Sequence, residues 1–379
     1  MDPAVDLVCF SQLRWDFVYQ RPQHLMSRWA RDHRVFFVEE PIFDADAAHL
    51  ELQIREHGLQ VVVPHLPKSP EDDINVLQQQ LIDRLFADQQ IHNAILWYST
   101  PMPIAFTRQL MPLVTVYDCM DELSAFQDAP PQLHQREAQL FQRADLVFTG
   151  GHSLYTAKRT QHPHVHLFPS SVDQAHFARA RHPGADPDDQ ARIPRPRLGF
   201  YGVLDERLDG DLLAGIADAR PSWHLVVIGP VVKINPAILP QRPNIHYLGP
   251  KSYSDLPSYL ANWDVALMPF AHNQTTRFIS PTKTLEYLAA GKPVVSTAIR
   301  DVLHPFGEQG LVRIAQTPSE VVAACEAALR EDEIARHQHV DEFLRGTSWD
   351  HTWAAMRQLI ECALAAHQPI GTSCDSSIT

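Results

Sequence analysis

Lys283 and Glu286 offer the most informative chemistry of this 379-residue chain. They are three residues apart, which places them on the same side of a helix. The first turn of a helix has free backbone amides and the positive end of the helix dipole, so it attracts anions. Lys283 would add a full charge to such a phosphate site, and Glu286 could accept hydrogen bonds from the two hydroxyls of a ribose. The spacing therefore predicts a nucleotide site; the alternative is a surface ion pair between the two side chains.

The residues around this pair predict the helix that must position it. Ser280 is a favoured N-cap, Pro281 suits the first helical position, and Thr282 lies in the first turn. Gly291 stands where a left-handed C-terminal cap is expected, and Pro293 prevents the helix from continuing. A short apolar strand follows at once. We expect Ser280, Pro281 and Thr282 to contact the nucleotide together with the lysine and the glutamate.

Length and composition restrict the class of protein. A chain of 379 residues exceeds one ordinary core, so two domains are expected. With 45% hydrophobic and 20% charged residues the composition is globular, and a net charge of −13 argues against a nucleic-acid surface. There is no apolar run of about 18 residues and no signal-like N-terminus, which predicts a cytoplasmic protein. Peripheral attachment to the inner face of a membrane stays open.

Short apolar stretches alternate with helical patterns, and the series begins again near the middle of the chain. This order predicts α/β domains with parallel sheets. We expect a Rossmann-like domain over 1–178, a linker over 179–196, a second Rossmann-like domain over 197–346, a last helix over 347–367 and a flexible tail over 368–379.

Two motifs resemble one family. The pattern S-P-x-K-x-x-E-Y-x-A-x-G-K-P-V-V-S at 280–296 resembles the donor-nucleotide segment of sugar-nucleotide glycosyltransferases with the GT-B fold, of the family 4 type (glycosyl transferases group 1). W-x-x-x-x-Q-R-P-Q-H-L at 15–25 resembles a subset of bacterial polysaccharide transferases, including the teichuronic-acid type.

The resemblance implies two Rossmann-like domains that face a central cleft, with the last helix packed back on the first domain. It implies transfer of a sugar from a nucleoside diphosphate sugar, of the UDP or GDP type, to a hydroxyl of a saccharide or lipid-linked acceptor in cell-surface polysaccharide synthesis. The acceptor would lie on the N-terminal domain, and the donor on the C-terminal one. No cofactor and no metal ion would be needed.

Further donor ligands are expected where parallel strands end, because open α/β sheets bind ligands at that edge. Gly202 would allow a close backbone approach, and Arg207 follows in the same loop, where the resemblance implies a basic contact to the diphosphate. Lys233 follows the next strand. The alternative for Arg207 is an exposed arginine that pairs with Asp205 or Asp209.

The loop after the first strand lacks the glycine pair of many relatives and the G-x-G-x-x-G fingerprint. It offers Arg21 and His24 instead, as candidates to hold a phosphate or an anionic acceptor. The alternative for Arg21 is a structural role.

The segment 113–126 is the expected catalytic loop. It leaves an apolar strand and places Asp118 and Asp121 within four residues. An inverting transfer needs a base that removes the proton of the acceptor hydroxyl, and a carboxylate can do so. We expect Asp118 first and Asp121 second in that role; the alternative is a loop of solvated or helix-capping acids.

One position departs from the family pattern. Retaining enzymes of this type carry two glutamates, of which the second matches Glu286, whereas the first falls at Phe278. The sequence therefore leaves retaining and inverting chemistry open. It also keeps two other functions in view: a sugar-nucleotide epimerase of the same fold, and a non-catalytic nucleotide-sugar-binding partner of a biosynthetic complex.

Overall fold

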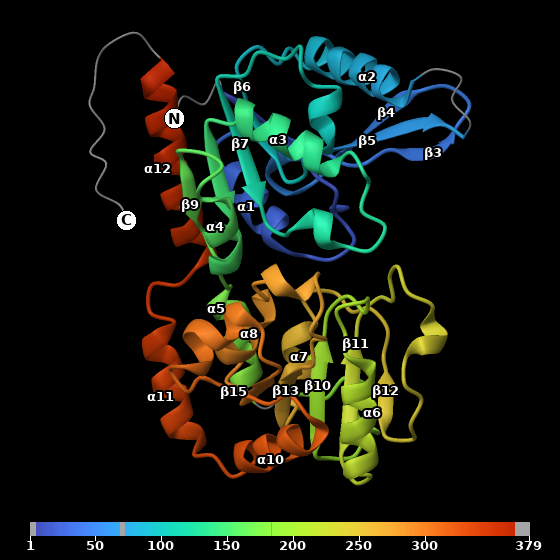
Figure 1. Ribbon diagram of the computed structural model, residues 1–379, viewed down its shortest axis with the longest axis vertical. Coiled ribbons are helices and arrows are strands. Elements are labelled where there is room, and N and C mark those ends of the chain that lie inside the picture. Colours follow the sequence, from blue (N-terminus) through green and yellow to red (C-terminus); the bar gives the residue numbers. More distant parts are fainter. Residues whose placement is uncertain (1–4, 69–72, 183, 368–379) are drawn as a thin grey trace.

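The computed structural model describes residues 5–68, 73–182 and 184–367, so the predicted tail lies outside the described part. Two α/β domains follow one another along the longest axis of the molecule (Figure 1). Each is built on its own twisted sheet, and most strands are buried along their whole length. Continuous burial is typical of parallel strands that are covered by helices on both faces.

The N-terminal sheet has nine strands in the order β3-β5-β2-β1-β6-β7-β8-β9, with β4 paired to β5. All pairs are parallel except β4 with β5. The strands are β1 (Asp6–Phe10), β2 (Val35–Val38), β3 (Ile42–Ala45), β4 (His49–Ile54), β5 (Gln60–Pro67), β6 (Ala94–Tyr98), β7 (Val114–Cys119), β8 (Leu146–Thr149) and β9 (Val165–Leu167). The helices are α1 (Arg21–Trp29), α2 (Ile74–Asp88), α3 (Leu133–Arg143) and α4 (His152–Lys158). The short helix α5 (Gln174–Ala178) follows them in the chain but packs into the core of the C-terminal domain through Phe177, so the chain has crossed to that domain before residue 178.

The C-terminal sheet has six parallel strands in the order β12-β11-β10-β13-β14-β15. In chain order this is 3-2-1-4-5-6, the doubly wound arrangement of dinucleotide-binding folds. The strands are β10 (Arg197–Tyr201), β11 (His224–Ile228), β12 (Ile245–Tyr247), β13 (Val265–Met268), β14 (Val294–Ser296) and β15 (Val312–Ile314). The helices are α6 (Gly210–Ala219), α7 (Leu256–Ala261), α8 (Thr282–Ala289), α9 (Arg300–Val302), α10 (Pro318–Ala328) and α11 (Glu333–Phe343).

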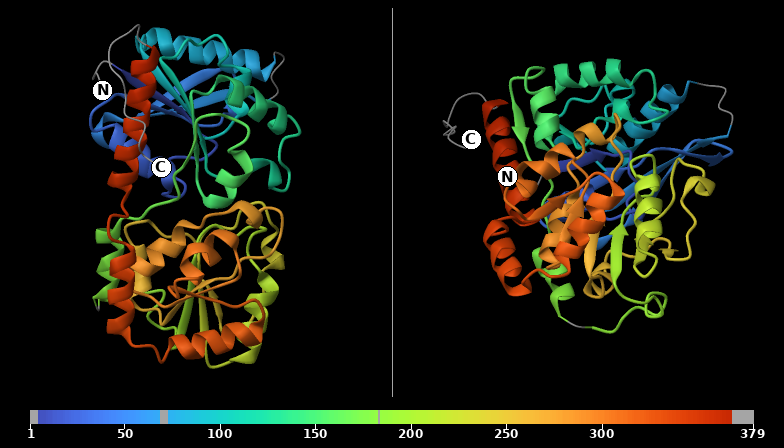
Figure 2. Two further views of the ribbon diagram at one scale, coloured as in Figure 1. Left: turned by 60° about the vertical axis from the view of Figure 1, so that its left-hand side comes forward. Right: turned by 60° about the horizontal axis from the view of Figure 1, so that its bottom comes forward.

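The last helix, α12 (Trp349–His367), returns to the N-terminal domain. Its Met356 and Ile360 are buried in the core that contains Leu25 and Trp29 of α1. Asp350 accepts from Arg28 of α1 at 2.9 Å. Figure 2 shows α11 and α12 one after the other along the same side of both domains. The chain therefore crosses between the domains twice on one side, which leaves the opposite side of the cleft without a covalent connection.

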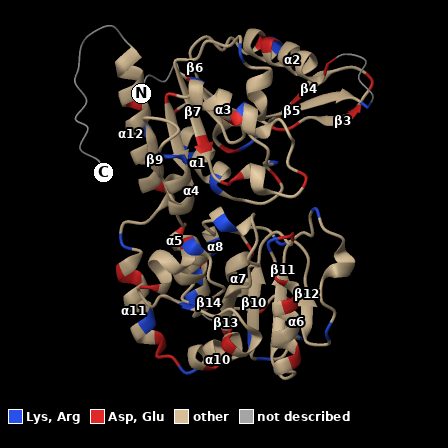
Figure 3. Cartoon of the chain, viewed as in Figure 1, with Lys and Arg blue, Asp and Glu red and all other residues tan. Residues whose placement is uncertain are grey.

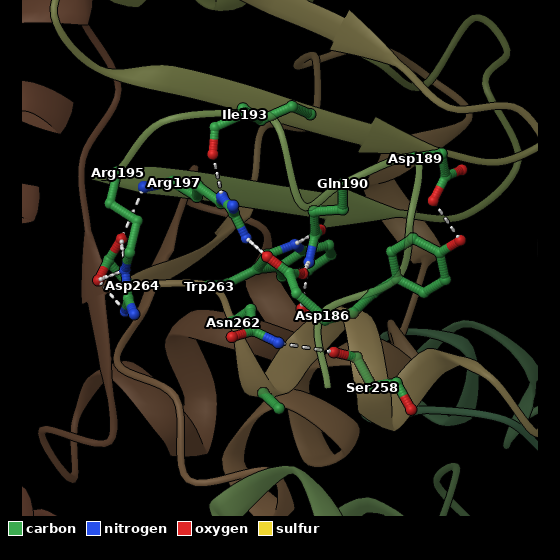
Figure 4. Close-up of polar contacts among 12 residues, drawn as sticks. Asp186, Asp189, Gln190, Ile193, Arg195, Arg197, Ser258, Asn262, Trp263 and Asp264 are labelled. Carbon is green, nitrogen blue, oxygen red and sulfur yellow. Dashed lines mark hydrogen bonds and ion pairs between the residues drawn. The ribbon is translucent and has the colours of Figure 1, made fainter. Parts of the chain in front are cut away.

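The segment predicted as a linker is attached to the C-terminal domain (Figure 4). Gln190 is fully buried, and the indole N–H of Trp263 donates to its side-chain oxygen at 2.8 Å. Asp186 accepts from Arg197 at 2.5 Å, and Asp189 accepts from Tyr259 at 2.8 Å. With so many polar contacts, this segment moves as part of the C-terminal domain.

Candidate active site

A cavity of about 350 Å³ lies between the two domains at the carboxyl edge of the C-terminal sheet. Residues 15–20 of the N-terminal domain form one wall. The ends of β10 and β11, the loop before α7 and the start of α8 form the other. Lys283 and Glu286 both line it, as do Gly202, Arg207 and Thr282.

The start of α8 differs by one residue from the sequence prediction. The helix begins at Thr282, and Pro281 is its N-cap with an extended ψ of 119°, so the expected Ser280 cap is wrong. No side chain caps this end, and within the described residues no acceptor is bonded to the backbone amides of Thr282 and Lys283. These amides are therefore free for a ligand. The helix stop is confirmed, because Gly291 has a φ of 71°.

Lys283 and Glu286 share the cavity wall without pairing with each other. No hydrogen bond or ion pair within the described chain engages the Lys283 amine, so the surface-pair alternative does not apply. Burial lowers the pKa of the Lys283 ammonium, while the nearby charge of Glu286 acts in the opposite direction. Burial raises the pKa of the Glu286 carboxyl. Both groups are thus partly desolvated and face the same cavity.

Tyr201 is a site residue that the sequence did not reveal. Its hydroxyl donates to Oε2 of Glu286, and its backbone amide donates to the Tyr287 hydroxyl at 3.0 Å. The bond from the Tyr201 hydroxyl fixes the carboxylate, and within the described chain no group donates to its second oxygen. The available signal was position: Tyr201 ends β10, directly before the glycine of the ligand-binding edge.

Gly202 lies against the lysine, as its predicted role requires. Its φ is 150°, and a Cβ at this position would lie 2.3 Å from Cε of Lys283. A Cβ on Gly229, after β11, would lie 1.7 Å from the carbonyl oxygen of Gly202. Side chains at either glycine would therefore block the packing of the two loops under the amine.

Arg207 reaches the cavity while it is held by Asp205. Its Nε and one terminal nitrogen donate to both carboxylate oxygens at 2.6 to 3.1 Å. The pairing expected as the alternative is therefore present, but Arg207 still lines the donor cavity. Lys233 does not line it; the amine of Lys233 lies 5.7 Å from the ring of Phe126, and the guanidinium of Arg207 lies 5.5 Å from the same ring. Phe126 belongs to the predicted catalytic loop, which thus packs on the donor domain.

Asp121 faces the donor residues across the cleft. It lines a small enclosed space of about 90 Å³ together with Arg207, Ser280, Pro281, Thr282 and Lys283. Burial raises the pKa of its carboxyl, and the positive charges of Arg207 and Lys283 limit the rise. No hydrogen bond within the described residues engages this carboxylate. It is a free, partly desolvated acid beside the predicted phosphate site.

Glu122 fixes the loop that carries Asp121. It forms an ion pair with Lys158 at 2.8 Å, and Lys158 forms a second ion pair with Glu137 at 2.8 Å. The lysine is only 3% exposed. Such a buried network holds the loop backbone in one place, because each group would be costly to leave unpaired.

Asp118 and Arg21 are brought together; Arg21 also lines the small space that holds Asp121, whereas Asp118 lines neither that space nor the donor cavity. Asp118 is 1% exposed and accepts three hydrogen bonds from Arg21, the shortest at 2.8 Å. The remaining terminal nitrogen of Arg21 donates to the Phe168 carbonyl at 2.7 Å. With all these partners inside the protein, Asp118 is unsuited to accept a substrate proton. The same contacts favour the structural role named as the alternative for Arg21, which stays a prediction. The geometry favours Asp121 over Asp118.

His24 lies in an aromatic cluster at the crossing between the domains. Its ring stacks on Trp349 with centroids 4.6 Å apart, and Tyr19 and Tyr253 pack edge-on against it. Burial lowers the pKa of His24 well below its usual value. The neutral ring offers no charge to a phosphate, which speaks against the predicted anion contact.

Phe278 does not line the donor cavity. It ends the short helix η6 (Thr276–Phe278) and packs against the core of the N-terminal domain. A carboxylate at position 278 could reach the space shared by Asp121 and Lys283 only if the packing of this residue against the N-terminal core changed.

Comparisons with known proteins agree with this geometry. Residues 195–331 match the family model described as glycosyl transferases group 1. A Bacillus subtilis protein named as the teichuronic acid biosynthesis glycosyltransferase TuaH is 26% identical over 262 residues. That alignment spans 62% of this chain and 64% of the relative, slightly less than two thirds of its length.

Solved structures share the whole architecture. Sucrose-phosphate synthase from Thermosynechococcus elongatus matches with a TM-score of 0.72 and 14% identity, over 95% of this chain and 99% of that one. Anabaena HepE in complex with UDP and glucose matches with a TM-score of 0.65 and 12% identity, over 94% and 99%. At these identities the likeness shows the fold, and the predicted GT-B fold is confirmed.

Proposed function

We propose that this chain, which belongs with the glycosyl transferases group 1 through residues 195–331 and has the GT-B fold, transfers a sugar from a nucleoside diphosphate sugar to an acceptor hydroxyl. The observation that carries the proposal is the unpaired Lys283 amine beside two free helix amides, with the anchored Glu286 one turn further along. The group 1 domain supports a transferase over the epimerase and the non-catalytic partner.

The donor would bind with its diphosphate at the start of α8. The amides of Thr282 and Lys283 and the Lys283 amine supply three donors to phosphate oxygens, and Arg207 lines the same cavity. The free oxygen of Glu286 would accept from a ribose hydroxyl. Lys251 and Tyr253 line the cavity on the side of β12 and leave room there for the base, of the UDP or GDP type.

Asp121 would act as the general base. Its carboxylate takes the proton of the acceptor hydroxyl while that oxygen attacks the anomeric carbon. The bond from that carbon to the diphosphate breaks, and its electron pair leaves with the nucleoside diphosphate. Lys283 and the helix amides stabilise the charge that grows on the leaving group. This assignment describes an inverting transfer without a resident metal ion.

We also propose a chemical class for the acceptor and a cellular location for the protein. The name of the relative TuaH refers to teichuronic acid biosynthesis, which supports a saccharide or lipid-linked acceptor in cell-surface polysaccharide synthesis. In the described part of the chain, no helix combines the length and apolarity that crossing a bilayer requires. We propose a cytoplasmic site of action, with peripheral membrane contact as the route to a lipid-linked acceptor.

Calorimetry with UDP and GDP tests the donor site. Lys283→Ala and Glu286→Gln should each weaken binding of the preferred nucleotide by about 1.5–3 kcal/mol, the usual contribution of a hydrogen bond to a charged group. Lys68→Ala and Glu342→Gln, at exposed positions outside the cleft, are the matched controls and should bind like the wild type. Unchanged affinity in both cleft variants would disprove the assignment of the site.

A further inference from the structure

Two further cavities follow the seam between the domains. The larger, of about 760 Å³, lies between α4 and the segments 272–278 and 298–300. The smaller, of about 600 Å³, lies between α3 and the loop of Glu122. Both are lined by Gln274 and Phe278, so the two cavities adjoin each other; together they are called the seam groove. In the ribbon view α4 stands directly over this part of the C-terminal domain (Figure 1).

The larger cavity has a basic lining. His272, Arg277 and Arg300 contribute to it, and no carboxylate does. All three side chains are exposed, and no ion pair within the described residues engages either arginine. Figure 3 shows basic segments of the C-terminal domain next to its boundary with the N-terminal domain. In a chain with a net charge of −13, an uncompensated basic cavity indicates an anionic ligand.

The remaining lining suits a saccharide. Thr156, Asn273 and Gln274 line the larger cavity. The Thr156 hydroxyl already donates to the His152 carbonyl, and the Asn273 amide is bonded to Glu206 and Thr276, so the Gln274 amide and the remaining bonding positions of the other two are available to a ligand. The ring of Phe278 is half-buried, and the guanidinium of Arg277 lies 5.2 Å from its centroid. Ligand sites commonly combine a few polar groups with an apolar surface, and the polar groups fix the orientation of the ligand. Hydroxyl and amide groups beside an aromatic ring give such a combination for a polyhydroxy ligand.

The smaller cavity leads toward the catalytic loop and has a different charge. Its carboxylates, Glu122 and Glu137, share the single cation Lys158, so one negative charge is left uncompensated. Glu122 directly follows Asp121. A ligand that extends along the groove would therefore meet positive charge at one end and a slightly negative polar surface near the proposed base, which favours a neutral end there.

We propose that the seam groove binds the acceptor, and that the acceptor is an acidic saccharide. Its carboxylate or phosphate groups lie at Arg277 and Arg300, and its neutral, hydroxyl-bearing end lies toward the Asp121 loop. This inference rests on the proposed transferase function, since it names the substrate class of that reaction.

The test is binding of defined saccharides to the full chain by calorimetry at low salt. The probes are an oligosaccharide of hexuronic acid residues, its carboxyl-reduced neutral counterpart, and a sugar phosphate of similar size. The wild type should bind one of the two acidic probes at least roughly tenfold more tightly than the neutral one. Arg277→Gln and Arg300→Gln should each weaken that binding by roughly three- to tenfold, as expected for exposed charge contacts. Which acidic probe binds identifies the anionic group.

Arg192→Gln is the matched control, because Arg192 is also exposed and without an ion pair in the described chain but lies outside the groove. Its affinity for every probe should equal that of the wild type. Equal binding of acidic and neutral probes, or full binding by the Arg277→Gln/Arg300→Gln double variant, overturns the proposal. UDP or GDP affinity measured on the same samples separates the acceptor hypothesis from the donor-site hypothesis. If the wild type binds nucleotide but no acidic saccharide, only the acceptor groove is refuted. If the wild type binds no nucleotide, the donor site is refuted.

Discussion

Asp121→Asn is expected to lower kcat for sugar transfer by about 10²- to 10⁴-fold, the usual contribution of a positioned general base. The amide has nearly the same shape but accepts no proton. Nucleotide affinity should be unchanged or slightly higher, because a negative charge near the diphosphate site is removed. The measurement is steady-state release of UDP or GDP in the presence of acceptor, together with calorimetry on the same protein.

The pH profile gives an independent readout of the same residue. The base works only when it is deprotonated, and burial raises the pKa of the Asp121 carboxyl above its ordinary value of 3.8. Activity of the wild type should therefore fall as the pH decreases through a point above that value. The variant should lose this acidic limb. Asp188→Asn, at an exposed position on the linker, is the control and should keep both rate and profile. A kcat for Asp121→Asn within a factor of three of the wild type would contradict the assignment.

The donor segment could be predicted from sequence because its signals are local. Gly291 and Pro293 end α8 for reasons that lie within a few residues, and β14 begins directly after them. The error at Ser280 has an equally local cause: with its ψ of 119°, Pro281 remains extended, so the helix starts one residue later. Conversely, β3 and β4 carry no clear strand signal in the sequence, because they are partly exposed and contain no continuous apolar run.

The catalytic assignment needed contacts between distant residues. Nothing in the sequence around Asp118 shows that Arg21, 97 residues earlier, occupies it. Likewise, nothing in the sequence indicates that Lys158 of α4 pairs with Glu122 in the loop after β7. Sequence spacing could identify a loop rich in carboxylates, but only burial and partners distinguish a base from a structural acid.

Arg21→Met is expected to destabilise the protein by about 3–5 kcal/mol, because it leaves the Asp118 carboxylate buried without its partner. Urea unfolding, followed by a probe of the N-terminal domain, measures the change at constant m-value. Arg31→Met is the control; Arg31 is exposed and pairs with Asp350 at the surface, so its loss should cost under about 1 kcal/mol.

The double variant Arg21→Met/Asp118→Leu separates a structural pair from a pair of ligands. If the two residues serve only each other, an apolar replacement of both should recover at least about half of the lost stability, since buried ion pairs often can be replaced by hydrophobic groups. The coupling energy from the four proteins then measures the interaction directly. If Arg21 instead held a phosphate or an acceptor, the single variant would keep its stability and lose substrate affinity. If Arg21→Met lowers the free energy of unfolding by under about 1 kcal/mol and raises the KM for the acceptor, Arg21 and Asp118 are active-site residues. If it lowers the free energy of unfolding by more and the second substitution restores it, Asp121 remains the carboxylate that faces the donor.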